Sequence, residues 1–133
     1  MQEPTHILVV DDEPDVKLMF RHWFRKEVKA KQYKFHFAHS ADEALSYLES
    51  AFSKFDSGRA EVALILSDIN MPGMNGLELL RIIKEKYAEL PVYMVTAYGD
   101  EKSEQTADRY GASGFISKPL DLDKLKQDVL SSV

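Results

Sequence analysis

The stretch Ile7-Leu-Val-Val-Asp-Asp-Glu-Pro14 sets the pattern for the whole chain. Its first four residues are apolar and mostly β-branched, which predicts a short strand buried on both faces. From Pro14 onward the apolar spacing becomes helical, and Asp12 and Glu13 suit the N-terminus of a helix. A buried strand followed directly by a helix is the repeating unit of an α/β fold.

Four more strand–helix units follow. Strands are predicted at 35–37, 62–66, 92–95 and 115–116, and the later helices at 40–55, 76–87, 103–110 and from 121. Strands that alternate with helices predict parallel strands joined by right-handed crossovers, and hence a three-layer α/β sandwich.

Apolar stripes predict the buried faces of the helices. The expected core positions are Val16, Phe20, Trp23, Phe24 and Val28 in the first helix, Leu45, Leu48, Phe52 and Phe55 in the second, and Leu77, Leu80, Ile83 and Tyr87 in the third. The helix at 103–110 has few apolar anchors, chiefly Ala107 and Tyr110, so it is expected to be weakly packed and easily displaced.

The composition excludes several classes of protein function. The chain has 133 residues, 22 acidic and 17 basic, with no cysteine and a formal charge of −5. This length suits one domain, and the lack of cysteine excludes disulfides, thiolate metal sites and a cysteine nucleophile. The negative charge argues against direct nucleic-acid or membrane binding, and no apolar run approaches the ~20 residues of a membrane span. The polar N-terminus lacks a secretory signal pattern, so a cytoplasmic protein is expected.

Chemically capable side chains stand where four of the predicted strands end. They are Asp11 and Asp12 after the first strand, Asp68 at the third, Thr96 at the fourth and Lys118 at the fifth. The carboxyl ends of parallel strands meet at one rim of the sheet, where such folds place their sites. Close carboxylates repel one another, and Mg²⁺ with its preference for oxygen ligands would relieve that repulsion. A carboxylate bridged by such a cation can attack phosphorus, while an ammonium and a hydroxyl can hold phosphoryl oxygens.

Four motifs in this pattern resemble the receiver domain of two-component response regulators. They are the 7–14 stretch, Ser67-Asp-Ile-Asn-Met-Pro-Gly-Met-Asn-Gly76, Val95-Thr-Ala97 and Gly111-Ala-Ser-Gly-Phe-Ile-Ser-Lys-Pro119. Each closes a predicted strand, and the resemblance covers about residues 5 to 131. The resemblance implies one receiver domain over residues 1–133 with a flavodoxin-like fold: a five-stranded parallel sheet in the order 2-1-3-4-5 with five helices.

The resemblance also implies a role for each matching position. Asp68 would accept a phosphoryl group, and Asp11, Asp12 and Asp68 would bind Mg²⁺ together with the backbone carbonyl of Asn70. Lys118 and Thr96 would contact the phosphoryl group. Phe115 would be the aromatic switch, and the peptide bond before Pro119 would be cis. Mn²⁺ could replace Mg²⁺. Asn70 and Tyr98 would tune hydrolysis of the acyl phosphate, and the bulk of Tyr98 predicts a long phosphoryl lifetime.

The implied partner is a sensor histidine kinase or a histidine phosphotransfer protein, which supplies the phosphoryl group. The domain would not be an enzyme in the usual sense but a phosphoacceptor that assists its own phosphorylation and dephosphorylation. Phosphorylation would shift the surface around the fourth helix and fifth strand toward a form that signals to a partner or output domain. The sequence leaves open whether the domain acts alone or within a longer chain. A homodimer through the fourth helix, fifth strand and fifth helix is a further option.

Two other functions fit parts of the pattern. A pseudo-receiver scaffold that never takes phosphate would be expected to lack one of the acidic, threonine or lysine positions, and none is missing. A phosphohydrolase of the haloacid dehalogenase type also uses a strand-end aspartate. It needs a second aspartate two residues further on, where this chain has Asn70.

Some features stay outside this scheme. Lys17, Arg21, Arg25 and Lys29 form a basic stripe on the first helix, either a solvated face or a docking surface. His36 and His39 are not expected to bind metal. The segment 41–61 is long for a receiver and predicts an extra helical turn around Phe52 and Phe55.

Overall fold

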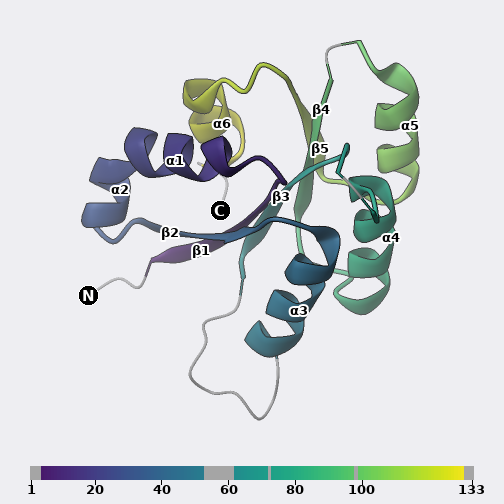
Figure 1. Cartoon of the computed structure of the whole chain (residues 1–133), viewed down its shortest axis with the longest axis horizontal. Helices are drawn as coiled ribbons and strands as arrows, with labels where there is room; N and C mark the ends of the chain where they lie inside the picture. Colours follow the sequence, from purple (N-terminus) through teal and green to yellow (C-terminus); the bar gives the residue numbers. More distant parts are fainter. Residues whose placement is uncertain (1–3, 53–61, 72, 98, 131–133) are drawn as a thin grey trace.

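The computed structural model describes residues 4–52, 62–71, 73–97 and 99–130. Strands and helices alternate along these segments (Figure 1). The elements are β1 (Thr5–Val10), α1 (Pro14–Trp23), α2 (Arg25–Lys29), β2 (Tyr33–Ala38), α3 (Ala41–Ala51), β3 (Leu64–Asp68), α4 (Gly76–Lys86), β4 (Val92–Thr96), α5 (Glu101–Arg109), β5 (Gly114–Ser117) and α6 (Leu122–Asp128).

The five strands form one parallel sheet in the order β2-β1-β3-β4-β5. This confirms the predicted topology. Because every strand runs the same way, the carboxyl ends of β1, β3, β4 and β5 meet at one rim. The chain order reverses next to β1, since β2 lies on one side of it and β3 on the other, which is where such sheets place their functional crevice.

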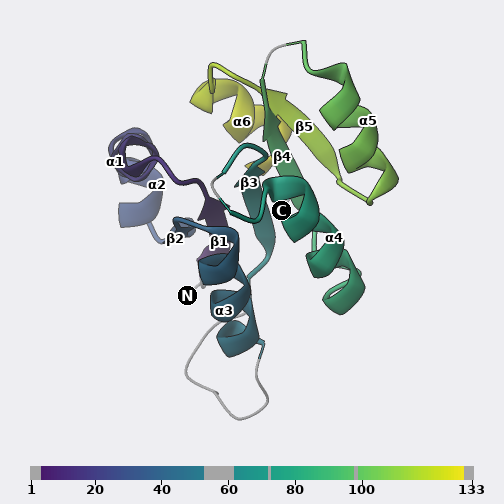
Figure 2. The same cartoon turned by 45° about the vertical axis from the view of Figure 1, so that its right-hand side comes forward.

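Helices cover both faces of the sheet, giving three layers (Figures 1 and 2). Alternate strand residues supply the two cores, as the two-residue period of a strand requires. Leu8, Ile65 and Met94 lie in the core on the side of α3, α4 and α5. Ile7 and Leu66 lie in the second core, under α1 and α6. In the described part of the chain, no helix has the length and apolar character needed to cross a membrane.

The first predicted helix is in fact two, so the described residues form six helices and not five. The break falls at Phe24, whose φ of −98° and ψ of 21° leave the helical region. Phe24 turns into the core and is fully buried, stacking on Phe20 and Phe35. Trp23 is 47% exposed and Val28 41% exposed, so their predicted core positions are wrong. The apolar spacing does not encode the break at Phe24, which places Val28 in a different helix from Phe20.

The other helices follow the predictions more closely. The α3 helix ends at Ala51, and Phe52 packs its ring against Tyr87 at a centroid distance of 5.0 Å. The predicted turn around Phe55 lies outside the described residues. In α4, Leu79 is buried, whereas Leu77 is only half-buried.

Side-chain caps fix the starts of α3, α4, α5 and α6. Ser40, Asn75, Asp100 and Asp121 each accept a hydrogen bond from the backbone N–H three residues ahead. Such caps satisfy one of the free amides that begin every helix and contribute about 1 kcal/mol each. Within α5 only Ala107 is buried, as the sparse anchors predict.

Candidate phosphoacceptor site

Three carboxylates converge at the rim of the sheet. Asp11 and Asp12 follow β1, and Asp68 ends β3, the neighbouring strand. One oxygen from each lies within 4.8 Å of the others, the only such cluster among the described residues. An all-oxygen set of this kind matches the ligand preference of Mg²⁺.

Asp68 is the most buried member of the cluster, with 2% of its side chain exposed. The ammonium of Lys118 donates to its Oδ2 at 3.1 Å, and the backbone N–H of Asn70 donates to its Oδ1 at 3.4 Å. Each oxygen therefore has one donor. Lys118 comes from the end of β5, so the fold brings together residues 50 positions apart in the sequence.

The charges at the rim influence one another. Burial raises the pKa of Asp11 above its ordinary value, and the negative charge of Asp68 adds to the effect. The backbone N–H of Glu13, which donates to Asp11 Oδ1 at 2.9 Å, offsets part of it. Burial also lowers the pKa of Lys118, but the hydrogen bond and charge of Asp68, with the charge of Asp11, outweigh it and raise that pKa. The rim therefore carries an excess of negative charge that a cation would neutralise.

Thr96 ends β4, the strand between β3 and β5. It is fully buried, and its hydroxyl has no hydrogen-bond partner within the described segments. A buried hydroxyl without a partner costs about 1–3 kcal/mol, so such groups are rare unless a ligand or a second conformation satisfies them. This hydroxyl is the observation that most clearly points to an acceptor brought by a ligand or a modification.

Gly76 allows α4 to begin directly against the end of β3. A Cβ at this position would lie 2.0 Å from the backbone oxygen of Asp68, closer than any real contact. The N–H of Gly76 donates to the carbonyl of Ile69 at 2.7 Å. The sequence indicates only a turn here, and the final glycine of the 67–76 motif is its one sign that two backbones meet.

Phe115 lies on β5 and is half-buried against the core under α3, α4 and α5. Its strand partner is Met94, two residues before Thr96. The Lys118–Pro119 bond is cis, as the resemblance predicts.

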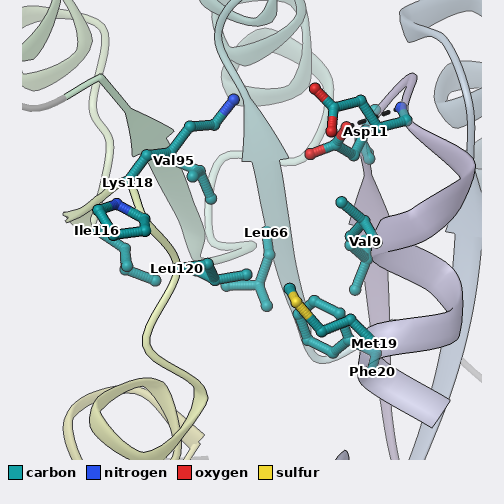
Figure 3. A pocket seen from close by; sticks show the side chains of 13 residues that line it. Val9, Asp11, Met19, Phe20, Leu66, Val95, Ile116, Lys118 and Leu120 are labelled. Carbon is teal, nitrogen blue, oxygen red and sulfur yellow. Dashed lines mark hydrogen bonds between the residues drawn. The ribbon is translucent and has the colours of Figure 1, made fainter. Parts of the chain in front are cut away.

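An apolar cavity of about 200 Å³ opens beside the carboxylates (Figure 3). Asp11 and Lys118 lie at one end, and Val9, Leu66 and Leu120 line the other. Of the predicted site residues, the structure brings Asp11, Asp12, Asp68, Asn70 and Lys118 to one rim, next to the end of β4 at Thr96. Tyr98 lies outside the described residues.

The comparisons with known proteins agree with this geometry. The model of the response regulator receiver domain family matches residues 7–130, so the chain belongs to this family. The receiver domain of NtrX from Brucella abortus superposes with a TM-score of 0.74 at 30% identity, covering 95% of this chain and 96% of that one. A response regulator receiver protein from Pseudomonas putida gives a TM-score of 0.80 at 25% identity over 98% of this chain and 99% of the other.

Relatives of known sequence differ in length. The response regulator PilR from Pseudomonas aeruginosa is 32% identical over 95% of this chain, but the match spans only 25% of PilR. An uncharacterised 14.6 kDa protein from Leptolyngbya boryana is 37% identical over 86% of this chain and 79% of its own length. The chain thus spans only about a quarter of the length of PilR. It spans about four-fifths of the length of the Leptolyngbya boryana protein.

Proposed function

We propose that this receiver domain accepts a phosphoryl group on Asp68 from a phosphohistidine donor. The observation that carries the proposal is the joint presence of three close carboxylates, the Lys118–Asp68 bond and the unpartnered hydroxyl of Thr96 among the described residues. A purely structural ion pair would explain Lys118 and Asp68, but not the two further carboxylates or the unsatisfied hydroxyl of Thr96.

The donor set supports Mg²⁺ as the bound cation. Asp11, Asp12 and Asp68 would hold it, with the carbonyl of Asn70 as the further ligand that the family resemblance implies. When bound, the ion neutralises negative charge on the carboxylates and on the incoming phosphoryl oxygens. Mn²⁺ has the same ligand preference and could replace it.

Transfer forms a bond between an Asp68 oxygen and phosphorus and breaks the phosphorus–nitrogen bond of the donor imidazole. Lys118 already bonds Asp68 Oδ2, so its ammonium is close enough to pass to a phosphoryl oxygen as the carboxylate becomes an acyl phosphate and the imidazole departs. The burial of Asp68 keeps the reaction in a place where these charges act strongly. The chain thus supplies the nucleophile and the positioning, while the leaving group comes from the partner.

Phosphorylation of Asp68 would also change the conformation of Thr96, Phe115 and α5. A phosphoryl group on Asp68 would offer the Thr96 hydroxyl the acceptor that it lacks among the described residues, and Thr96 would move toward it. Movement of Thr96 would leave room for Phe115 to turn further inward from its half-buried position. The α5 helix, held by little more than Ala107, is the element that such a change would shift most easily.

The full signalling role follows from this proposal. A sensor kinase or a histidine phosphotransfer protein would be the donor, and an output domain or separate protein would respond to the face made by α5, β5 and α6, which could also pair two copies. Tyr98 would slow hydrolysis of the acyl phosphate. A Tyr98→Glu variant that loses its phosphoryl group at the wild-type rate would contradict that role.

Two alternatives remain to be separated by experiment. A pseudo-receiver would fold identically but stay unmodified. A dehalogenase-type phosphohydrolase would turn over a phosphate ester, and Asn70 argues against this because an amide cannot transfer the proton.

Incubation with acetyl phosphate, followed by intact mass measurement, distinguishes all three. We expect a single phosphoryl adduct that requires Mg²⁺ and is absent in Asp68→Asn. An unmodified folded wild type would favour the pseudo-receiver. Steady release of phosphate from a stable phosphate ester would favour the hydrolase.

A further inference from the structure

Positive charge is concentrated in one short part of this acidic chain. Residues 17–34 contain seven of the 17 lysine and arginine residues and one acidic residue, Glu27, although the whole chain carries −5. Glu27 lies 3.8 Å from Lys126 of α6, and only 14% of its side chain is exposed. The one carboxylate of the segment is therefore paired with a cation of another element, α6.

Four of these cations surround a groove between the first two helices and the edge of the sheet. Arg21 from α1, Arg25 and Lys29 from α2, and Lys34 from β2 line it, with Val28, Phe35 and Phe37 as its apolar part. Its volume is about 440 Å³, and no carboxylate of the described residues lines it. Val28 is 41% exposed, so the groove contains an accessible apolar side chain. The groove suits a ligand that is both acidic and apolar.

The groove borders an open strand edge. The β2 strand pairs with β1 alone in the described parts of the chain. The N–H of Thr5 donates to the carbonyl of Gln32, and the N–H of Asp11 donates to that of Ala38. In a parallel ladder, bonding residues alternate, so the even-numbered residues of β2 face β1. The backbone groups of Tyr33, Phe35 and Phe37 therefore point toward the open side, where another strand could bind them.

We propose that an acidic, extended segment of a partner polypeptide pairs with the outer edge of β2. Its backbone would bond the outward amides and carbonyls of Phe35 and Phe37. Its apolar side chains would enter the groove beside Val28, and its carboxylates would meet Arg25 and Lys29. Strand addition of this kind takes affinity from the backbone bonds and specificity from side-chain pockets along the edge.

Other occupants fit the same surface less well. A second copy of the chain would bring four more cations to this edge, and like charges repel. Single-stranded nucleic acid needs free aromatic faces for base stacking. Phe35 lies within 5.1–5.3 Å of the rings of Phe24 and Phe20, and Phe37 packs against Phe20 at 6.1 Å, so both rings are already engaged. An extended polypeptide matches the outward amides and carbonyls of the strand, because it repeats donors and acceptors at the same spacing.

Selection from a library of short random peptides tests the chemistry without a known partner. We expect the recovered peptides to alternate acidic and apolar residues. Their affinity should fall at least about tenfold in the double variant Arg25→Glu/Lys29→Glu and should weaken with added salt. The matched control is Lys102→Glu/Arg109→Glu, which reverses two exposed cations of α5 on the opposite face. Circular dichroism checks that both variants are folded.

Amide hydrogen exchange of a recovered complex tests the geometry. The amides of Phe35 and Phe37 should gain protection, whereas those of Lys34 and His36, which already face β1, should change little. The Asp68→Asn variant should bind the peptide as the wild type does, which separates this surface from the phosphoacceptor chemistry.

Several results would overturn the proposal. Peptides without acidic residues, equal binding to the charge-reversed variant, or no gain in protection at Phe35 and Phe37 would each do so. Tighter binding of a single-stranded oligonucleotide or of anionic vesicles, lost in the same variant, would assign the groove to that ligand instead.

Discussion

Replacing Thr96 with valine should stabilise the unphosphorylated protein. The two side chains have the same branched shape, so the substitution exchanges a hydroxyl for a methyl group. The hydroxyl is fully buried and has no hydrogen-bond partner among the described residues. Burial of an unsatisfied hydroxyl costs about 1–3 kcal/mol, and that cost disappears in the variant.

The free energy of unfolding measured by urea titration in a chelating buffer tests this expectation. Ser67→Ala is the matched control because Ser67 is equally buried, but its hydroxyl donates to the backbone oxygen of Asp68 at 3.1 Å. Its loss should destabilise the protein by about 0.5–1.5 kcal/mol, the net value of a typical hydrogen bond. The two hydroxyl deletions should therefore change stability in opposite directions.

The same pair also connects stability to the switch. If the Thr96 hydroxyl bonds the phosphoryl group, phosphorylation should stabilise the wild type more than Thr96→Val. A Thr96→Val variant that is less stable than the wild type before phosphorylation would refute the reasoning, because it would mean that the hydroxyl is already satisfied.

Three further substitutions test the rim. Gly76→Ala should lower the free energy of unfolding in urea by more than about 3 kcal/mol, because its Cβ would lie 2.0 Å from a backbone oxygen. Gly73→Ala should lower it by only about 1–2 kcal/mol, because Gly73 has a φ of 77° but open space around it. Asp11→Asn should stabilise the metal-free protein at neutral pH. Because folding raises the pKa of Asp11, the wild type loses stability as pH rises through that raised value. The difference in unfolding free energy between wild type and Asp11→Asn should therefore vanish when it is measured at pH values below the ordinary carboxyl pKa. Lys118→Gln should destabilise by about 1–3 kcal/mol, because it leaves the buried Asp68 carboxylate without its half-exposed cation. If that is the cause, the Lys118→Gln/Asp68→Asn double variant should be as stable as Asp68→Asn alone.

Much of the fold can be predicted from local patterns. The all-apolar runs that form β1, β3 and β4 are largely buried on both faces, so their composition alone indicates central parallel strands. A parallel topology requires the strand ends to share a rim, and this places Asp68 near Lys118 from the sequence pattern alone. The cap at Ser40 is also predictable, because a cap depends only on residues within one turn.

What the sequence does not predict depends on contacts between distant elements. At the break, the Phe24 ring packs against Phe35 of β2. Only this tertiary packing shows that Trp23 and Val28 face outward. Amphipathic spacing gives the same prediction for one long helix as for two short ones. The unsatisfied hydroxyl of Thr96, established within the described residues, is equally inaccessible to sequence reasoning, since its partners depend on tertiary packing.

Chemical identification of the modified residue tests whether Asp68 is the phosphoacceptor. Borohydride reduces an aspartyl phosphate to homoserine, and peptide mass spectrometry then locates it. After treatment with acetyl phosphate and Mg²⁺, we expect homoserine at position 68 alone, with none in the absence of Mg²⁺. Homoserine at position 11 or 12, or an unreduced chain from a folded and Mg²⁺-saturated protein, would contradict it.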